Sequence, residues 1–331
     1  MPDALLGEGV RVLVLGSGKI GHEINALGVV EALGAPYELR RVEPHAWYAR
    51  LAPYGPVDPK DKPGAAGSIF PDPPPDLAIS SGRVTVPYMR ALKRAYGRRV
   101  FAVFLQDPRH ARSEMDLIWT PEHDSLRGAN VITTLTSPHP LSPARIAAAR
   151  EAPDSRLASL PGPRCAVVLG GPSGAQHFTP DDVARLGEAI RAIVAQGFSV
   201  MATPSRRTPP ELLAAVRDGL AAAPGFVWDG RGDNPYLPIL ALADAVLVTG
   251  DSANMVGEAT ATGAPVHIFE PSGGESKKLA SAIDALVRIG AARRFEGRIE
   301  RFSYTPIDSS GEIARAIARR FRASRAATAA R

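Results

Sequence analysis

The segment VTGDSANMVGEA, Val248 to Ala259, predicts a strand end, a glycine turn and a helix start. Gly250 supplies the turn, and either Asp251 or Ser252 is placed to cap the helix. The free N–H groups and the positive dipole end of such a helix point at whatever lies beyond the strand. Glu258 follows Ser252 by six residues, and at about 1.5 Å per residue that spans roughly the distance from a diphosphate to a ribose. The segment therefore predicts a nucleoside-diphosphate site, provided that the Asp251 carboxylate bonds the backbone and does not face the phosphates.

Short β-branched runs alternate with Ala- and Leu-rich stretches on either side of this segment, a pattern typical of βα units on parallel sheets. In the first half, strands are predicted at 10–15, 37–43, 76–80, 100–105, 116–120 and 130–133, with helices at 22–33, 84–96 and 143–150. In the second half, strands are predicted at 165–169, 198–203, 226–228, 244–249 and 265–269, with helices at 180–195, 209–223, 236–243, 252–262 and 276–289. The Pro- and Ser-rich stretch 150–164 breaks the pattern. We therefore predict two doubly wound α/β domains, 1–150 and 164–309.

A basic segment, 310–331, follows the second domain. Ile313, Ile317 and Phe321 recur at four-residue spacing, which predicts a helix with one buried face docked back across both domains. The last ten residues are expected to fray. Five arginines leave contact with an anionic membrane surface open as an alternative role: Arg315, Arg319, Arg320, Arg322 and Arg325.

The composition is that of a soluble globular α/β protein, with 331 residues, 45% hydrophobic and 22% charged. The single cysteine, Cys165, excludes an internal disulfide and a cysteine metal cluster, and is predicted to be a core side chain in a reducing compartment. No apolar run is long enough to span a bilayer, so a cytoplasmic protein is expected, peripheral at the inner membrane if the tail contacts lipid. The net charge of +5 favours phosphate-bearing ligands.

The first glycine-rich loop, GSGKIGH from Gly16 to His22, has the GxGxxG spacing of a dinucleotide site. Glu43 ends the second predicted strand, where a Rossmann protein holds a ribose, so an NAD-dependent oxidoreductase is one hypothesis. Against it, Lys19 places a bulky cation in the tight turn. His22 at the helix start is a candidate general base, because imidazole titrates near neutrality. A turn that only packs helix on strand is the other interpretation.

Three further loops of the first half carry clustered polar groups: SSGRVTVP (80–87), LQDPRHAR (105–112) and TPEHDSLRG (120–128). Because the carboxyl ends of parallel strands meet at one edge, these side chains are predicted to converge there: Arg83, Asp107, Arg109, Glu122, His123 and Asp124. The adjacent acid and imidazole of Glu122 and His123 suit proton transfer, while a turn or capping role fits any single Asp equally well. No HxxxH or DxD pairing sets a coordination geometry, so no metal is expected.

The second half has three matching loops. GGPSG, 170–174, lets backbone N–H groups approach an anion closely. In SRRTPPE, Thr208 is predicted as an N-cap with Pro209 at the first helical position, leaving Arg206 and Arg207 at the rim. Two adjacent guanidinium groups repel each other unless an anion neutralises them, which favours phosphate binding. In RGDNPY, Asn234 is predicted to cap a helix that starts at Pro235, with contact to a nucleotide base as an additional interpretation.

A serine-bearing helix start followed by Glu-Ala resembles the donor site of GT-B glycosyltransferases and of UDP-N-acetylglucosamine 2-epimerases. Eight ordered segments between residues 18 and 266 resemble a narrower group, the bacterial branch of the "elongated mitochondria", or mitochondrial fission, family: GKIGHEINALG, SSGRVTVP, LQDPR, PEHD, LGGPSG, SRRTPP, WDGRGDNPY and TGDSANMVGEATATGAPV. Members of that family are regarded as GT-B-type glycosyltransferases by similarity.

This resemblance implies two Rossmann-like domains facing a GT-B cleft, with the C-terminal helix crossing back. It implies a nucleotide-diphosphate sugar in the second domain, and an envelope-type acceptor, lipid-linked or lipopolysaccharide-like, against the first. No metal, other cofactor or nucleic acid is expected. His22 matches the histidine in the first glycine-rich loop of MurG-like transferases, although Lys19 departs from that loop.

The candidate site residues fall into three groups. The catalytic candidates are His22, Glu122 and Asp107. The donor candidates are Gly171, Ser173, Arg206, Arg207, Asn234, Ser252 and Glu258, with Glu258 on the ribose. The acceptor-side candidates are Lys19, Arg83 and His123. The leading hypothesis is an inverting transfer in which His22 or Glu122 takes the acceptor proton. The alternatives are an oxidoreductase, an epimerase, and a non-catalytic membrane-associated adaptor that acts through its basic tail.

Overall fold

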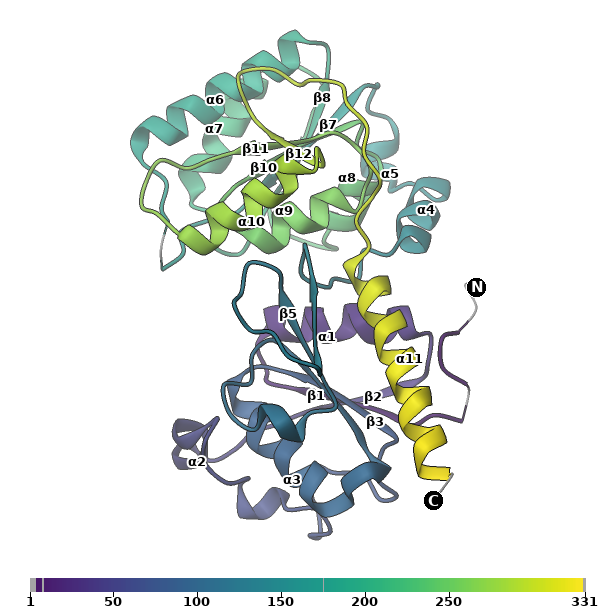
Figure 1. Ribbon diagram of the computed structural model, residues 1–331. Coiled ribbons are helices and arrows are strands. Elements are labelled where there is room, and N and C mark those ends of the chain that lie inside the picture. Colours follow the sequence, from purple (N-terminus) through teal and green to yellow (C-terminus); the bar gives the residue numbers. More distant parts are fainter. Residues whose placement is uncertain (1–3, 8, 175, 330–331) are drawn as a thin grey trace. The chain divides into compact units, whose positions relative to one another are not determined.

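The computed structural model describes residues 4–7, 9–174 and 176–329, which form two compact units, each built on its own parallel sheet (Figure 1). The first unit comprises Met1–Ser142 and Asp308–Arg331, and the second comprises Pro143–Ile307. The division thus falls before the boundary expected at 150–164. The reason is that helix α4, Pro143–Glu151, packs on α8, Tyr236–Ala241, within the second unit.

The sheet of the first unit has the strand order β2-β1-β3-β4-β5-β6, all parallel. Its strands are β1 Val12–Gly16, β2 Tyr37–Arg41, β3 Leu77–Ser81, β4 Phe101–Leu105, β5 Leu117–Pro121 and β6 Val131–Thr134. Its helices are α1 Ile20–Leu33, α2 Ala46–Leu51, α3 Val86–Tyr96 and α11 Ser309–Ala329. The four inner strands are buried along their whole length, since helices cover both faces of the sheet.

Helix α11, the last helix in Figure 1, packs beside α1 on one face of this sheet. Ile313, Ile317 and Phe321 are buried there with Val29 and Trp119, which confirms the predicted apolar face. Its contacts with α1, β4 and β6 all lie in the first unit, so the chain does cross back to that unit. Docking of the helix across both domains stays a prediction. Helix α11 continues to Ala329, and the last two residues lie outside the described ones. Fraying of its last turns stays a prediction.

Two arginines of α11 bond within the first unit. Arg322 donates to the Leu5 carbonyl (2.6 Å), and Arg325 forms an ion pair with Asp76 (3.0 Å). Two of the five arginines listed for the tail thus have a structural role. A membrane role for the tail stays a prediction.

The second sheet has the order β12-β11-β10-β7-β8-β9, again all parallel. Its strands are β7 Arg164–Leu169, β8 Ser199–Pro204, β9 Gly225–Val227, β10 Ala245–Thr249, β11 Val266–Phe269 and β12 Ala292–Arg294. Its remaining helices are α5 Ser155–Ala158, α6 Pro180–Ala195, α7 Pro210–Leu220, α9 Ala253–Thr260 and α10 Lys277–Arg288. Cys165 is fully buried, as expected. The two doubly wound sheets are thus confirmed.

Each sheet has one point where the direction of winding reverses. In the first, β1 lies between β2 and β3; in the second, β7 lies between β8 and β10. At such a point the loops that follow the two inner strands diverge and leave a crevice at the carboxyl edge, the usual ligand position in doubly wound sheets. The loops after β1 and β3, and those after β7 and β10, are therefore where a functional site is expected.

Candidate functional site

At the β7/β10 switch point, Ser252 caps helix α9. Its hydroxyl accepts from the Met255 N–H (3.5 Å), so Ser252, one of the two predicted caps, fills that role. Asp251 does not cap. Its buried carboxylate accepts from the Gly171 N–H (3.0 Å) and the Thr249 hydroxyl (2.6 Å), tying the two loops together. The charge that would have opposed a diphosphate is thus directed into the protein.

The first residue after β7, Gly170, must be a glycine because of this carboxylate. A Cβ on Gly170 would lie 2.1 Å from an Asp251 oxygen, closer than any side chain tolerates. Burial raises the pKa of Asp251 above its ordinary value, although the Thr249 and Gly171 bonds oppose the shift. Because the Gly171 N–H donates to Asp251, it is already used, and the prediction that it binds phosphate has no support in this geometry. Ser173, also predicted on the phosphates, is exposed in a turn where its hydroxyl accepts from the Gln176 N–H (3.1 Å).

The two adjacent arginines differ in their contacts. Arg207 donates to the Pro172 carbonyl (3.0 Å) and lies 3.8 Å from the Asp251 carboxylate. The Arg206 guanidinium is exposed and takes part in no hydrogen bond or ion pair with the residues that the structure describes. Of the pair, Arg206 is therefore the cation left for an external anion.

The predicted cap at Thr208 is wrong. Helix α7 starts at Pro210 with Pro209 at the cap position and no side-chain cap. The Thr208 hydroxyl instead lies 2.9 Å from the Leu169 carbonyl oxygen and 2.6 Å from that of Gly170, while the Ser205 N–H donates to it (2.8 Å). Thr208 thereby joins the loops after β7 and β8, which fixes the segment that carries Arg206.

Glu258 projects from α9 and is paired with Tyr236, whose hydroxyl donates to its carboxylate. Burial raises the pKa of Glu258 to about 7, although the Tyr236 bond opposes this shift. Burial together with Glu258 also raises the pKa of Tyr236. A carboxyl group that changes charge near neutral pH is typical of functional sites.

Tyr236 was not found from the sequence as a site residue, because it lies 22 residues before Glu258 and only the fold joins them. The sequence feature that could have pointed to Tyr236 is the Asn-Pro-Tyr turn that contains it. Helix α8 begins at Tyr236, with Pro235 at the cap position and no side-chain cap, so the predicted cap at Asn234 is wrong. Asn234 instead accepts from the Tyr236 N–H (3.0 Å) in the turn before the helix. Contact of Asn234 with a nucleotide base stays a prediction.

At the β1/β3 switch point of the first unit, His22 is half-buried near the start of α1. Its Nδ1 lies 3.0 Å from the Ser17 hydroxyl oxygen, and its ring rests against Gly82 in the loop after β3. Burial, followed by the nearby Lys19 ammonium, lowers the pKa of His22, which favours the neutral imidazole. Lys19 itself is exposed at the N-cap position and makes no side-chain cap. A neutral imidazole at this edge is suited to accept a proton.

The glycine-rich loop after β1 is already occupied by a protein carboxylate. Glu23 is buried, accepts from the Gly18 N–H (3.2 Å) and forms a two-pronged ion pair with Arg41 (2.9 and 3.0 Å). A Cβ on Gly16 would lie 2.6 Å from the same carboxylate. The Glu23 carboxylate therefore lies against the turn that binds the pyrophosphate in dinucleotide enzymes. Its negative charge would repel a pyrophosphate, which argues against the oxidoreductase hypothesis. Glu43, the proposed ribose partner, is exposed two residues beyond β2.

Asp107, a catalytic candidate, has a structural role. Although burial favours its neutral form, the Arg112 guanidinium (2.6 and 2.8 Å) and the Arg109 N–H (2.8 Å) hold the pKa of Asp107 below its ordinary value. An ionised, paired carboxylate is a poor proton acceptor. It stabilises a strained loop, in which Gln106, Arg109 and Ala111 have φ of 105°, 61° and 58°.

The other first-unit candidates lie around the same edge. Arg83 donates to the carbonyl groups of Arg50 (3.4 Å) and Ala52, so part of its hydrogen-bonding capacity fixes the end of α2. Glu122 is exposed and His123 half-buried, directly after β5. Within the described chain, no hydrogen bond or ion pair joins Asp107 or Glu122 to His22. Of the three catalytic candidates, His22 has the geometry best suited to the role.

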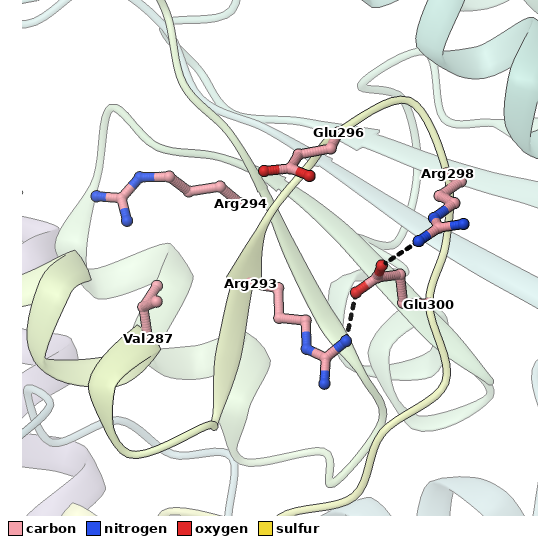
Figure 2. A pocket seen from close by; sticks show the side chains of 6 residues that line it. All are labelled: Val287, Arg293, Arg294, Glu296, Arg298 and Glu300. Atoms are coloured by element: carbon pink, nitrogen blue, oxygen red, sulfur yellow. Dashed lines mark hydrogen bonds and ion pairs between the residues drawn. The ribbon is translucent and has the colours of Figure 1, made fainter.

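A separate hollow of about 260 Å³ lies beside β12. Figure 2 shows Arg293 and Arg298 directed at Glu300, while Arg294 points away from them. Arg294 forms ion pairs with Glu270 (2.9 Å) and Asp284 (2.6 Å). Each arginine is paired with a carboxylate, so we assign no anion site here. Among residues 4–7, 9–174 and 176–329, no cluster of acidic, His and Cys side chains has the arrangement of a metal site, and no helix is long and apolar enough to cross a bilayer.

The sequence matches the family model described as mitochondrial fission ELM1 over residues 20–321. The chain belongs to this family. This confirms the resemblance carried by the eight segments. The ELM1 protein of Arabidopsis thaliana is 28% identical over 272 residues, which cover 74% of this chain and 64% of the plant protein. The uncharacterized protein RP120 of Rickettsia prowazekii is 30% identical over 160 residues, 46% of this chain and 45% of that protein. The chain thus spans less than two thirds of these relatives.

Solved structures give a weaker likeness. MurG of Acinetobacter baumannii superposes with a TM-score of 0.49 and 14% identity, covering 95% of this chain and 93% of MurG. The UDP-GlcNAc 2-epimerase of Methanocaldococcus jannaschii gives 0.49 and 12%, covering 93% of this chain and 98% of the epimerase.

Proposed function

We propose that this protein binds the diphosphate of a nucleotide sugar at the β7/β10 switch point and transfers the sugar, without a metal, to an acceptor hydroxyl. The observation that supports it best is the grouping of three features in one unit. The capped N-terminus of α9 follows β10, Arg206 has no partner among the described residues, and Glu258 lies along α9 with a pKa near neutrality. Helix N–H groups and a guanidinium suit phosphates, and a carboxylate suits ribose hydroxyls.

The proposed reaction divides the work between the two units. The second unit holds the donor and stabilises the negative charge that grows on the leaving diphosphate through Arg206 and the α9 dipole. The first unit supplies a general base, the neutral imidazole of His22. Attack on the sugar carbon from the face opposite the diphosphate gives an inverting transfer. We propose an envelope-type acceptor, lipid-linked or lipopolysaccharide-like, as the family resemblance implies, and a cytoplasmic location.

The first test is thermal unfolding with UDP, GDP, ADP, CMP and TDP at millimolar concentration. At least one nucleotide is expected to raise the unfolding temperature, since a ligand at about 100 times its Kd stabilises by about 2.7 kcal/mol. Arg206→Ala and Glu258→Ala are expected to lose this shift. Arg217→Ala, an exposed arginine near the other end of α7, is the matched control and is expected to keep it. If none of the five nucleotides changes the unfolding temperature, the donor proposal fails.

The affinity for that nucleotide is expected to rise with pH. An ionised Glu258 can accept both ribose hydroxyls, whereas the protonated acid cannot. Because the pKa of Glu258 is about 7, the fraction of protein with an ionised Glu258 is roughly tenfold smaller at pH 6 than at pH 8. The affinity is expected to fall by the same factor, since only that fraction binds well. Calorimetric titration across this range measures the effect. Glu258→Gln is expected to bind more weakly without the Glu258 component of the pH dependence; an unchanged pH profile in this variant would assign the effect to the ligand.

The adaptor alternative is favoured by the fission role in the family's name, and it predicts a different result. Under it, Glu258→Ala and Arg206→Ala leave the cellular phenotype intact, while loss of the basic tail abolishes it. Because α11 is part of the first unit's core, the tail should be tested by charge reversal at the exposed Arg315 and Arg319, not by truncation.

A further inference from the structure

The corner where the loops after β1 and β3 meet fixes the orientation of one imidazole ring. We propose that Ser17 and Gly82 are positioning residues that hold Nδ1 of His22 toward the protein and leave Nε2 as the atom that takes the acceptor proton. This inference rests on the proposed function, in which His22 is the general base. It specifies which nitrogen of the His22 ring accepts the proton and which groups select the tautomer of the ring.

The contacts on the ring are concentrated at one edge. The Ser17 hydroxyl oxygen lies 3.0 Å from Nδ1. A Cβ added to Gly82 would lie 2.4 Å from Nδ1, 3.0 Å from Cε1 and 3.0 Å from the Ser17 oxygen. Gly82 also has φ of 100°, a conformation that side-chain-bearing residues rarely adopt. The backbone of Gly82 and the hydroxyl of Ser17 therefore close the Nδ1 edge to any ligand.

The opposite edge of the ring stays accessible. Nε2 of His22 forms no hydrogen bond with the described residues. It is also not one of the buried polar atoms without a partner, so it keeps some exposure to solvent. His22 as a whole is half-buried. A substrate hydroxyl that approaches the β1/β3 switch point can thus meet the ring at Nε2.

The hydrogen bond to Ser17 provides a way to select the tautomer. A neutral imidazole carries one N–H, and whichever nitrogen lacks the hydrogen is the base. If Nδ1 donates its N–H to the Ser17 oxygen, Nε2 keeps its lone pair. The Lys19 ammonium favours the neutral form of the ring, and the carboxylate of Glu23, the residue after His22, is paired with Arg41. Ser17 then plays the part of the third group that orients a catalytic base.

The proton step balances without a co-reactant. The acceptor O–H proton moves to Nε2 as the acceptor oxygen bonds to the sugar carbon. The bond between that carbon and the diphosphate oxygen breaks, and its electron pair stays on the diphosphate. The imidazolium that forms retains its Nδ1–H bond to Ser17, so Ser17 moves no proton.

Nitrogen NMR of the full chain labelled in its histidines tests this directly. The chain has seven histidines, and the His22 signals are those lost in His22→Gln. The wild type at pH 7 is expected to show His22 with hydrogen on Nδ1. Ser17→Ala is expected to give a mixture of tautomers, Ser17→Thr to restore the single form, and Gly82→Ala to shift the signals by displacing the ring. Ser125→Ala, an exposed serine in the loop after β5, is the matched control.

Two results would overturn the inference: hydrogen on Nε2 in the wild type, or an unchanged tautomer in Ser17→Ala. Because the spectrum needs no substrate, it separates this inference from the proposed function, which fails if no nucleotide binds. Once a donor and acceptor are found, Ser17→Ala is expected to lower kcat by about threefold to tenfold, the worth of one neutral hydrogen bond, with KM unchanged. His22→Gln is expected to lower kcat by about 10²–10⁴.

Discussion

Replacing Ile317 and Phe321 together by alanine is expected to unfold the first unit while the second stays folded. Both side chains are buried, with 0% and 5% of their surface exposed, and the Phe321 ring meets Phe101 edge-on with centroids 5.8 Å apart. The two truncations together cost roughly 5–10 kcal/mol, against about 5–15 kcal/mol for the whole stability of a domain. The final helix, although last in sequence, belongs to the core of the first unit.

Chemical denaturation followed by limited proteolysis measures this outcome. Cleavage of the double variant is expected within the first unit's residues, while a fragment close to Pro143–Ile307 survives. Arg319→Ala is the matched control on the same helix, because Arg319 is exposed. A double variant as resistant as the wild type would mean that α11 contributes little to the stability of the first unit.

Acidification from pH 7 to pH 4 is expected to destabilise both units through one buried histidine in each. Burial lowers the pKa of His139 and of His267 to about 4, with Asp308 and Glu300 respectively opposing the shift. The unfolded chain binds these protons at the ordinary value, so the stability is fully present above about pH 6.5 and is lost as the pH falls toward 4. The shift corresponds to about 3 kcal/mol in each unit.

The buried rings explain why protonation is resisted. His139 accepts from the Leu141 N–H at Nδ1 (3.3 Å), and His267 accepts from the Glu300 N–H at Nε2 (3.0 Å). A proton on either accepting nitrogen breaks its bond. Urea denaturation at several pH values measures the loss, and because carboxylates also titrate, the histidine share is read from His139→Gln and His267→Gln.

Each variant is expected to be less stable at pH 7, with a smaller decline between pH 6.5 and 4 in the affected unit. His177→Gln, at an exposed histidine, should retain the wild-type decline. Equal pH dependence in all four proteins would show that the histidines are not responsible.

The sequence predicted most elements of the fold because local periodicity reflects burial. The inner strands are continuous apolar runs, and the side chains of Ser252 and Asn234 bond backbone N–H groups within three residues of their own position. The elements that escaped prediction are α2, α5 and β12, which are short. In β12 two of three residues are exposed arginines, so no apolar pattern marks it.

The candidate site was predictable in its location and not in its pairings. The loops after β1, β3, β7 and β10 could be assigned to the carboxyl edges of the sheets because parallel strands share one such edge. The sequence did not predict which charged groups in these loops are without a partner. Asp107 proved to be bonded to Arg112, and the Gly171 N–H to Asp251. Only the second of these pairs joins segments far apart in sequence, yet both changed the role assigned to a candidate.

In Val248–Ala259, the sequence by itself determined a strand, a glycine turn and a capped helix, because each depends on neighbours along the chain. The tertiary structure decided that Asp251 faces inward to the β7 loop and that Glu258 is paired with Tyr236. It also decided that Glu23 fills the first glycine-rich loop, where the sequence alone left a dinucleotide site open. The physical reason is that a charged group's partner and burial depend on proximity in space, and proximity is set only when both loops of a switch point are folded together.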